Sequence, residues 1–212
     1  MYMNMEASMV DLVPTPESVM NILQSTGAYR KGHFVYPNGK HASHYFQMPL
    51  AFRFYDNARI LSVGLSRLFR MEKSIASQLP KVSVISPSPG GIMVAFGVRE
   101  ALSAEQIYWA EMEEGKRQFR QYMSASEVHP AIIVDDILRS GRAIVETIQL
   151  CKDIGTEVIG CGVIAKFEDG PNEFEGVPVK SLLSFDVNFY ETQEEWEKSP
   201  NASDVEVEKV RF

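Results

Sequence analysis

One stretch of this chain, Ala131 to Val145, constrains the fold and the chemistry more than any other. It reads Ala-Ile-Ile-Val-Asp-Asp-Ile-Leu-Arg-Ser-Gly-Arg-Ala-Ile-Val, so an apolar run leads directly into the adjacent acids Asp135 and Asp136. A short loop with a serine and Gly141 follows, and then a helix is predicted to begin. A buried strand that ends in paired carboxylates and opens onto a helix N-terminus suits a polyanionic sugar. The carboxylates can face hydroxyls or a metal ion, and the loop amides can face a phosphate.

The composition predicts a soluble globular chain with one α/β domain and an appendage. It has 212 residues, of which 45% are hydrophobic and 23% charged. The net charge of −7 and the pI of about 5.2 argue against a nucleic-acid partner. Two cysteines, Cys151 and Cys161, are typical of a protein in the reducing cytoplasm, where we expect this one. No run of about 18 apolar residues predicts a membrane span, and residues 1–8 lack a signal-peptide pattern.

The rest of the chain alternates between predicted helices and strands. Helices are expected over 16–26, from Asp56 onwards, over 92–102 and over 142–154, and strands over 81–86, 106–111, 157–165 and 177–185. Asp56 is expected to cap the second helix, in which Ile60, Val63, Leu65 and Leu68 recur near the helical period. Residues 32–47 hold aromatics around a Pro-Asn-Gly turn and predict a hairpin. The alternation predicts an α/β fold with a mostly parallel central sheet flanked by helices.

The loop Arg139–Ala143, directly after the acid pair, is the first candidate anion site. Gly141 lets the backbone approach a phosphate, Ser140 adds a hydroxyl, and Arg139 or Arg142 adds positive charge. Ligands of parallel sheets bind at the carboxyl ends of the strands, where this loop is expected. The alternative is that one of the two acids only caps the next helix, although one acid would be enough for a cap.

A second candidate is the turn Pro87-Ser-Pro-Gly-Gly-Ile92, which also lies between a strand and a helix. Gly90 and Gly91 at the start of a helix make a possible second anion cradle. By itself this pattern equally fits an ordinary turn. Two anion cradles on one sheet edge would suit a ligand with phosphates at both ends.

The segment 111–120 is the third candidate, because it is polar and carries Lys116, Arg117 and Arg120 between two predicted strands. A flexible basic arm of this kind can close over a pyrophosphate and stabilise the charge that develops as it departs. The alternative is a solvated hairpin with offsetting charges, which composition alone favours.

The segment 32–47 is the fourth candidate and contains three histidines, His33, His41 and His44. A metal site is disfavoured, because no acid or cysteine lies at ligand spacing and His41 and His44 would point to opposite faces of a strand. Aromatic side chains with a lysine can instead line a pocket for a flat base.

These four segments, in this order, resemble the type I phosphoribosyltransferases, and the orotate phosphoribosyltransferase branch most closely. That family has an apolar strand, two acids and a Thr/Ser-Gly loop. The matching runs are Ile132-Ile-Val-Asp-Asp-Ile-Leu-Arg-Ser-Gly141, Gly32-His-Phe34 with Asn38-Gly-Lys-His41 and Tyr45, Ser86-Pro-Ser-Pro-Gly-Gly-Ile92, and Glu111-Met-Glu-Glu-Gly-Lys116 with Arg120-Gln121. The resemblance covers roughly residues 15 to 165, and it implies one domain over 1–212 in which 1–50 and about 186–212 form a hood over the site.

The resemblance also implies a reaction, in which a phosphoribosyl group passes from 5-phosphoribosyl-1-pyrophosphate to a nitrogenous base and pyrophosphate leaves. Magnesium would enter with the co-substrate, with Asp135 and Asp136 as possible contacts through water, and the protein would be a homodimer. The roles implied are these: ribose hydroxyls on Asp135 and Asp136; the 5-phosphate on Arg139, Ser140, Gly141, Arg142 and Ala143; pyrophosphate on Gly90 and Gly91; the closing arm on Lys116, Arg117 and Arg120; the base on Phe34, Lys40, Tyr45 and Phe46.

The chain departs from the family pattern at several of these positions. Thr-Thr-Gly or Thr-Ala-Gly is usual where Arg139-Ser-Gly stands, and a small residue is common where Arg142 stands. Met112 and Gln121 replace arginines of the arm. The resemblance makes orotate the expected base. The departures leave open a purine-base transferase, or a binding or regulatory protein of the same fold with little or no turnover.

Overall fold

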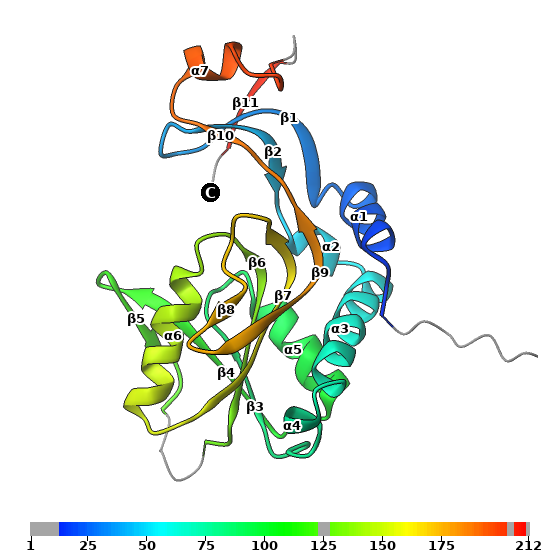
Figure 1. The fold of residues 1–212 in the computed structure, drawn as a ribbon, viewed down its shortest axis with the longest axis vertical. Coiled ribbons are helices and arrows are strands. Elements are labelled where there is room, and N and C mark those ends of the chain that lie inside the picture. The colour runs from blue at the N-terminus through cyan, green and yellow to red at the C-terminus, as the bar shows by residue number, and fades with distance from the viewer. Residues whose placement is uncertain (1–12, 123–127, 203–205, 211–212) are drawn as a thin grey trace, which may run out of the picture.

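The structure, a computed structural model, describes residues 13–122, 128–202 and 206–210 and arranges them around two sheets (Figure 1). The larger sheet has the strand order β5-β4-β3-β6-β7-β9-β8, and the smaller has the order β10-β2-β1-β11. The expectation for residues 1–8 lies outside the described residues. Within the described ranges, no helix combines the length and the apolar character needed to cross a membrane.

The larger sheet has a parallel centre with an antiparallel strand at each edge. Its parallel strands are β4 (Gln106–Glu113), β3 (Ser83–Ser86), β6 (Ala131–Leu138), β7 (Val158–Phe167) and β9 (Val177–Phe185). The edge strands are β5 (Lys116–Phe119) and β8 (Glu173–Phe174). The predicted, mostly parallel sheet is therefore confirmed. The carboxyl ends of β3, β6 and β7 share one edge, so the loops that follow them lie close together.

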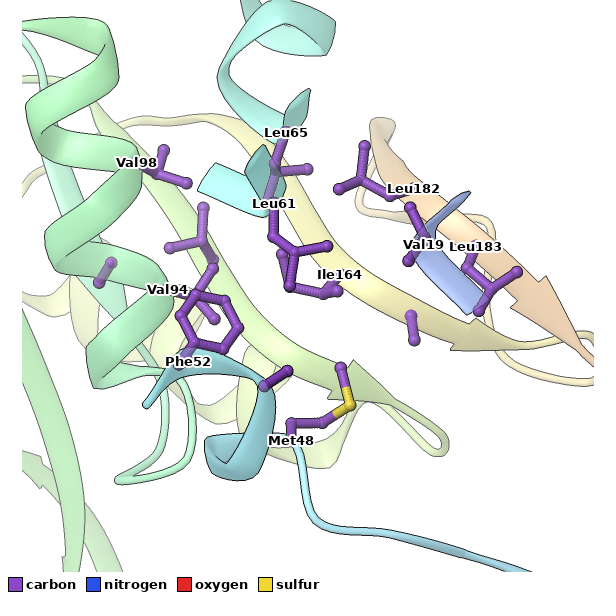
Figure 2. Close-up of a cluster of buried hydrophobic side chains, with 14 of the residues drawn as sticks. Val19, Met48, Phe52, Leu61, Leu65, Val94, Val98, Ile164, Leu182 and Leu183 are labelled. Atoms are coloured by element: carbon purple, nitrogen blue, oxygen red, sulfur yellow. The ribbon is translucent and has the colours of Figure 1, made fainter. Parts of the chain in front are cut away.

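Helices cover both faces of this sheet, and the alternation of side chains along β6 explains why. Ile132 and Val134 point into the core shared with α3 (Tyr55–Arg70) and α5 (Ile92–Leu102), whereas Ala131 and Ile133 point into the core shared with α6 (Arg142–Asp153). Figure 2 shows the first core, where residues of both helices face Ile164 of β7. The short helices α2 (Pro49–Phe52) and α4 (Lys73–Ala76) adjoin α3, and α1 (Pro16–Ser25) packs against β9.

Helix α3 corrects two details of the sequence analysis. Its N-cap is Phe54, so Asp56 lies in the first turn and does not cap the helix. Leu61, Leu65 and Phe69 are fully buried, whereas Ile60 is 40% exposed. Leu65 is confirmed in the core and Leu68 packs against it, but Ile60 lies outside the buried face. That face also contains small residues, Ser62, Gly64 and Ser66, which a hydrophobicity pattern does not mark.

The smaller sheet joins both ends of the chain beside the carboxyl edge of the larger sheet (Figure 1). Its centre is the predicted hairpin of β1 (Tyr29–Val35) and β2 (His41–Phe46), which pair antiparallel. The tail adds β10 (Phe189–Tyr190) next to β2 and β11 (Val207–Lys209) next to β1, and α7 (Gln193–Glu197) lies between them in sequence. The described part of the tail is thus built into a sheet and is not a loose end.

Candidate active site

The acid pair lies in the second half of β6 and is held by short hydrogen bonds. One oxygen of Asp135, Oδ1, accepts from the Asp136 amide at 3.0 Å and from the Ser88 hydroxyl at 2.7 Å. Asp136 Oδ1 accepts from the Ile137 amide at 2.8 Å. Burial, and then the neighbouring charge of Asp136, raise the pKa of Asp135 to about 8. Neither acid caps α6, whose N-cap is Gly141, so the helix-cap alternative was wrong.

The turn after β3 lies directly against the acid pair, and its two glycines make this approach possible. A Cβ on Gly91 would lie 2.5 Å from Asp135 Oδ1 and 2.7 Å from Ser86 Oγ, and one on Gly90 would lie 2.9 Å from Asp136 Oδ2. Any larger residue would have to displace a carboxylate. The structure therefore brings the second candidate turn to the acids, and with it Ser88, which the sequence analysis had not singled out.

The loop after β6 forms a small pocket at the start of α6. The pocket has a volume of about 170 Å³ and is lined by Asp135 and residues 137–144. Gly141 has a φ of +74°, and a Cβ there would lie 2.4 Å from the Phe174 ring. No side chain caps α6, so the pocket faces amides that a helix N-terminus normally leaves unpaired. The five residues assigned to a 5-phosphate all line this one pocket.

Glu146 links the arm to this loop, and the sequence analysis missed it. Its carboxylate accepts from Arg142 Nε at 2.6 Å and from Arg117 Nε at 2.9 Å. The hydrogen bond from Arg142 is the first cause that lowers the pKa of Glu146. Arg117 also donates to the Pro87 carbonyl, so one arginine of β5 contacts both the turn after β3 and helix α6. The signal was available, because Glu146 follows Arg142 at the i,i+4 spacing of a helical ion pair.

The candidate arm is a regular hairpin of β4 and β5. Arg120 pairs with Glu113 at 2.9 Å and with Glu111 at 3.5 Å, so part of its charge is offset, as the solvated-hairpin alternative expects. Arg117 is largely buried against α6, whereas Lys116 stands exposed at the start of β5. The three basic residues of the arm therefore have different surroundings.

The four residues expected around a base are divided between different surroundings. Phe34 and Tyr45 are buried with ring centroids 5.5 Å apart in the smaller sheet. Phe46 stacks on Phe185 at 4.3 Å beside the main core, and Lys40 pairs with Glu191 at 2.5 Å. Only Phe34 and Tyr45 are in mutual contact.

The histidines of the smaller sheet are engaged with one another and with aromatic rings. His33 Nε2 and His41 Nδ1 lie 2.7 Å apart, and His33 stacks on Trp196 at 4.1 Å. His44 stacks on Tyr29 at 5.4 Å. Among the described residues, no group of three or more histidine, cysteine or acidic side chains is placed to hold a metal ion.

Solved structures share this fold. Orotate phosphoribosyltransferase from Aeropyrum pernix superposes with a TM-score of 0.56 at 19% identity, covering 78% of this chain and 93% of that one. A phosphoribosyltransferase from Corynebacterium diphtheriae gives a TM-score of 0.59 at 15% identity, covering 80% of this chain and 95% of that one. The fold is that of the type I phosphoribosyltransferases.

Relatives in sequence narrow the class. Orotate phosphoribosyltransferase from Thermotoga petrophila is 31% identical over 83% of this chain and 89% of its own length. The enzyme of that name from Thermoanaerobacter sp. strain X514 is 33% identical over 84% of this chain and 89% of its own length. No family model matches the sequence. The chain belongs to the orotate phosphoribosyltransferase family.

Proposed function

We propose that this protein transfers the phosphoribosyl group of 5-phosphoribosyl-1-pyrophosphate to orotate and releases pyrophosphate. The observation that carries the proposal is the meeting of two glycine turns at one acid pair, joined by the hydrogen bond from Ser88 to the buried Asp135. A ligand that has a phosphate at each end and a ribose between them matches this arrangement. The sequence relatives named for orotate transfer support the choice of base.

Each part of the site has a role in this reaction. The carboxylates of Asp135 and Asp136 accept hydrogen bonds from the ribose hydroxyls, the amides of 139–143 bind the 5-phosphate, and the turn at Gly90 and Gly91 receives pyrophosphate. The bond from the anomeric carbon to pyrophosphate breaks with its electron pair leaving on oxygen. A ring nitrogen of the base forms the new bond, and the proton of that nitrogen is released to solvent. Catalysis then depends on positioning and on charge stabilisation, to which Lys116 contributes at the departing pyrophosphate.

Magnesium fits this site as a companion of the co-substrate. The ion commonly binds through one or two carboxylates together with substrate phosphates and water, and the adjacent Asp135 and Asp136 offer that number of carboxylates. Contact through water agrees with the short hydrogen bonds that already occupy Asp135 Oδ1. When bound, the ion would neutralise negative charge on the pyrophosphate.

We also propose that the smaller sheet forms a hood over the site within a single domain.

We further propose that the protein is a homodimer. An apolar groove of about 420 Å³ between α3 and α5 is lined by Tyr55, Met93 and neighbouring residues. Phe96 of α5 is also 50% exposed. A second copy would cover this surface. Sedimentation of the wild type and of Met93→Glu tests this, with a shift toward monomer expected for the variant.

We propose a cytoplasmic location on the basis of the two unpaired cysteines. Cys151 and Cys161 are free and buried on α6 and β7, and burial raises the pKa of each thiol to about 12. Unpaired cysteines of this kind are common in reducing compartments. Imaging of a tagged copy in its native cell tests the assignment.

A panel of bases tests the reaction. The protein, with magnesium and 5-phosphoribosyl-1-pyrophosphate, is offered orotate, uracil, adenine, guanine and hypoxanthine, and pyrophosphate release is measured. Release with orotate alone is expected. Release with a purine would support the purine-base alternative. If no base gives pyrophosphate release but the sugar pyrophosphate still binds, a binding or regulatory role is supported. The altered residues Arg139 and Met112 are the reason for considering that role.

A further inference from the structure

Arg139 belongs to the loop after β6, but its side chain leaves that loop for the smaller sheet. Its guanidinium carbon lies 3.6 Å from the ring centroid of Phe189, on β10. The Phe189 ring in turn lies 5.9 Å from the rings of Tyr36 and Phe167. Arg139 therefore crosses from the phosphate loop to the aromatic side chains of the smaller sheet, where a flat base is expected.

Unlike the other arginines of the site, Arg139 does not pair with a carboxylate of the described residues. Arg117 and Arg142 both pair with Glu146, and Arg120 pairs with Glu111 and Glu113. Arg139 is exposed and forms no salt bridge with any residue in the described ranges. An arginine fixed on an aromatic ring keeps its N–H edge available for an anion.

The surroundings of Arg139 favour an anion with a flat apolar body. Tyr36 stands beside Phe189, and its phenol is uncharged at neutral pH, so it does not repel an anion; burial raises its pKa further, to about 12. The pocket for the 5-phosphate already has the amides at the start of α6, which do not need a second long side chain. A carboxylate on a planar ring would match the planar guanidinium with two parallel hydrogen bonds.

We propose that the Arg139 side chain determines base specificity by binding the carboxylate of orotate, and that its guanidinium is not a ligand of the 5-phosphate. This inference rests on the proposed function, because it takes the base to be orotate. It explains why this position carries a long cation although it lies in a phosphate loop. Phe189 acts through Arg139 as a positioning residue that holds the guanidinium at the hood.

Two nucleotides that share the ribose 5-phosphate separate the possible roles. Orotidine 5′-monophosphate carries the carboxylate and uridine 5′-monophosphate lacks it, so their affinities are measured by calorimetry for the wild type, Arg139→Gln and Arg142→Gln. For Arg139→Gln we expect the affinity for the orotidine nucleotide to fall by about tenfold to a hundredfold, the range for a charge-assisted hydrogen bond, with the uridine nucleotide little changed. Arg142→Gln, the matched control in the same loop, should weaken both nucleotides by a similar factor.

Other results would overturn the inference. Equal losses for both nucleotides in Arg139→Gln would make Arg139 a phosphate ligand, and no loss for either would leave it without a role in binding. Arg139→Lys provides a second variant in case the glutamine variant misfolds, and it should keep part of the preference, since it retains the charge without the planar fork. A wild type that releases pyrophosphate with orotate but binds both nucleotides alike refutes the inference alone. A wild type without release overturns the proposed function, and the inference falls with it.

Discussion

The Ser88 hydroxyl donates a 2.7 Å hydrogen bond to the Asp135 carboxylate, joining the turn after β3 to the end of β6. The bond connects two segments that are 47 residues apart in sequence. It also lowers the pKa of Asp135, but burial and the charge of Asp136 act more strongly, so the pKa stays raised, at about 8. The site therefore holds a carboxyl group whose charge state changes near neutral pH.

The raised pKa of Asp135 predicts a dependence of stability on pH. Between about pH 4 and pH 8 the folded protein keeps a proton on Asp135 that the unfolded chain has released. The stabilisation from this group is thus fully present at low pH and is lost as the pH rises through about 8. Asp135→Asn removes the titrating group, so thermal melts should show the variant gaining stability relative to the wild type from pH 5 to pH 8.

The matched control for this measurement is Asp153→Asn, which changes an exposed carboxylate at the end of α6. This control should follow the wild-type profile across the same pH range. Parallel profiles for the wild type and Asp135→Asn would show that Asp135 is ionised in the folded protein at pH 5.

Substitution of the second acid, Asp136, should weaken binding of the sugar pyrophosphate without unfolding the protein. In the wild type the Ile137 amide donates to Asp136 Oδ1 at 2.8 Å. In Asp136→Asn the side-chain oxygen can still accept this hydrogen bond. The charge that would bind the ribose hydroxyls is removed, so affinity for 5-phosphoribosyl-1-pyrophosphate should fall by about tenfold or more, measured by calorimetry. Unchanged affinity would remove the acid pair from the sugar site.

The sequence predicted those parts of the molecule that depend on local patterns. The apolar run before Asp135 predicted the buried strand β6, and the glycines before α5 and α6 marked both turns. These features were predictable because strand periodicity and helix termini are set by neighbouring residues.

The parts that escaped prediction depend on contacts between distant segments. Nothing near Phe189 in the sequence indicates that its ring meets Arg139, 50 residues earlier, because β10 reaches the site only through its pairing with β2. The stacking of Phe46 on Phe185 likewise joins segments that are far apart in the sequence.

The exposed lysine of the hairpin predicts a loss of turnover. Lys116→Ala removes a cation that we assign to the departing pyrophosphate, so turnover should fall by about a hundredfold or more, as for other groups that stabilise charge in the transition state. Binding of the base should change much less. Steady-state kinetics with orotate as the varied substrate separate the two effects.

The control for the hairpin is Lys152→Ala on α6, which removes an exposed lysine paired with Glu175 outside the site. Its turnover should equal that of the wild type, because a surface ion pair of this kind contributes at most about 1 kcal/mol to stability. If Lys116→Ala also kept full turnover, the hairpin would be only a solvated surface feature.

Two glycines with the same backbone conformation give the last prediction. Gly141 and Gly155 have φ values of +74° and +75°, but a Cβ on Gly155 would meet open space, whereas one on Gly141 would lie 2.4 Å from the Phe174 ring. Gly155→Ala should therefore lower the free energy of unfolding only by the cost of an alanine in the left-handed conformation, about 1 to 2 kcal/mol. Gly141→Ala should lower the free energy of unfolding by a further ~1 to 3 kcal/mol, because its Cβ overpacks against Phe174. Denaturant titration of both variants measures the difference, and equal losses would show that the loop can move away from Phe174 at no cost.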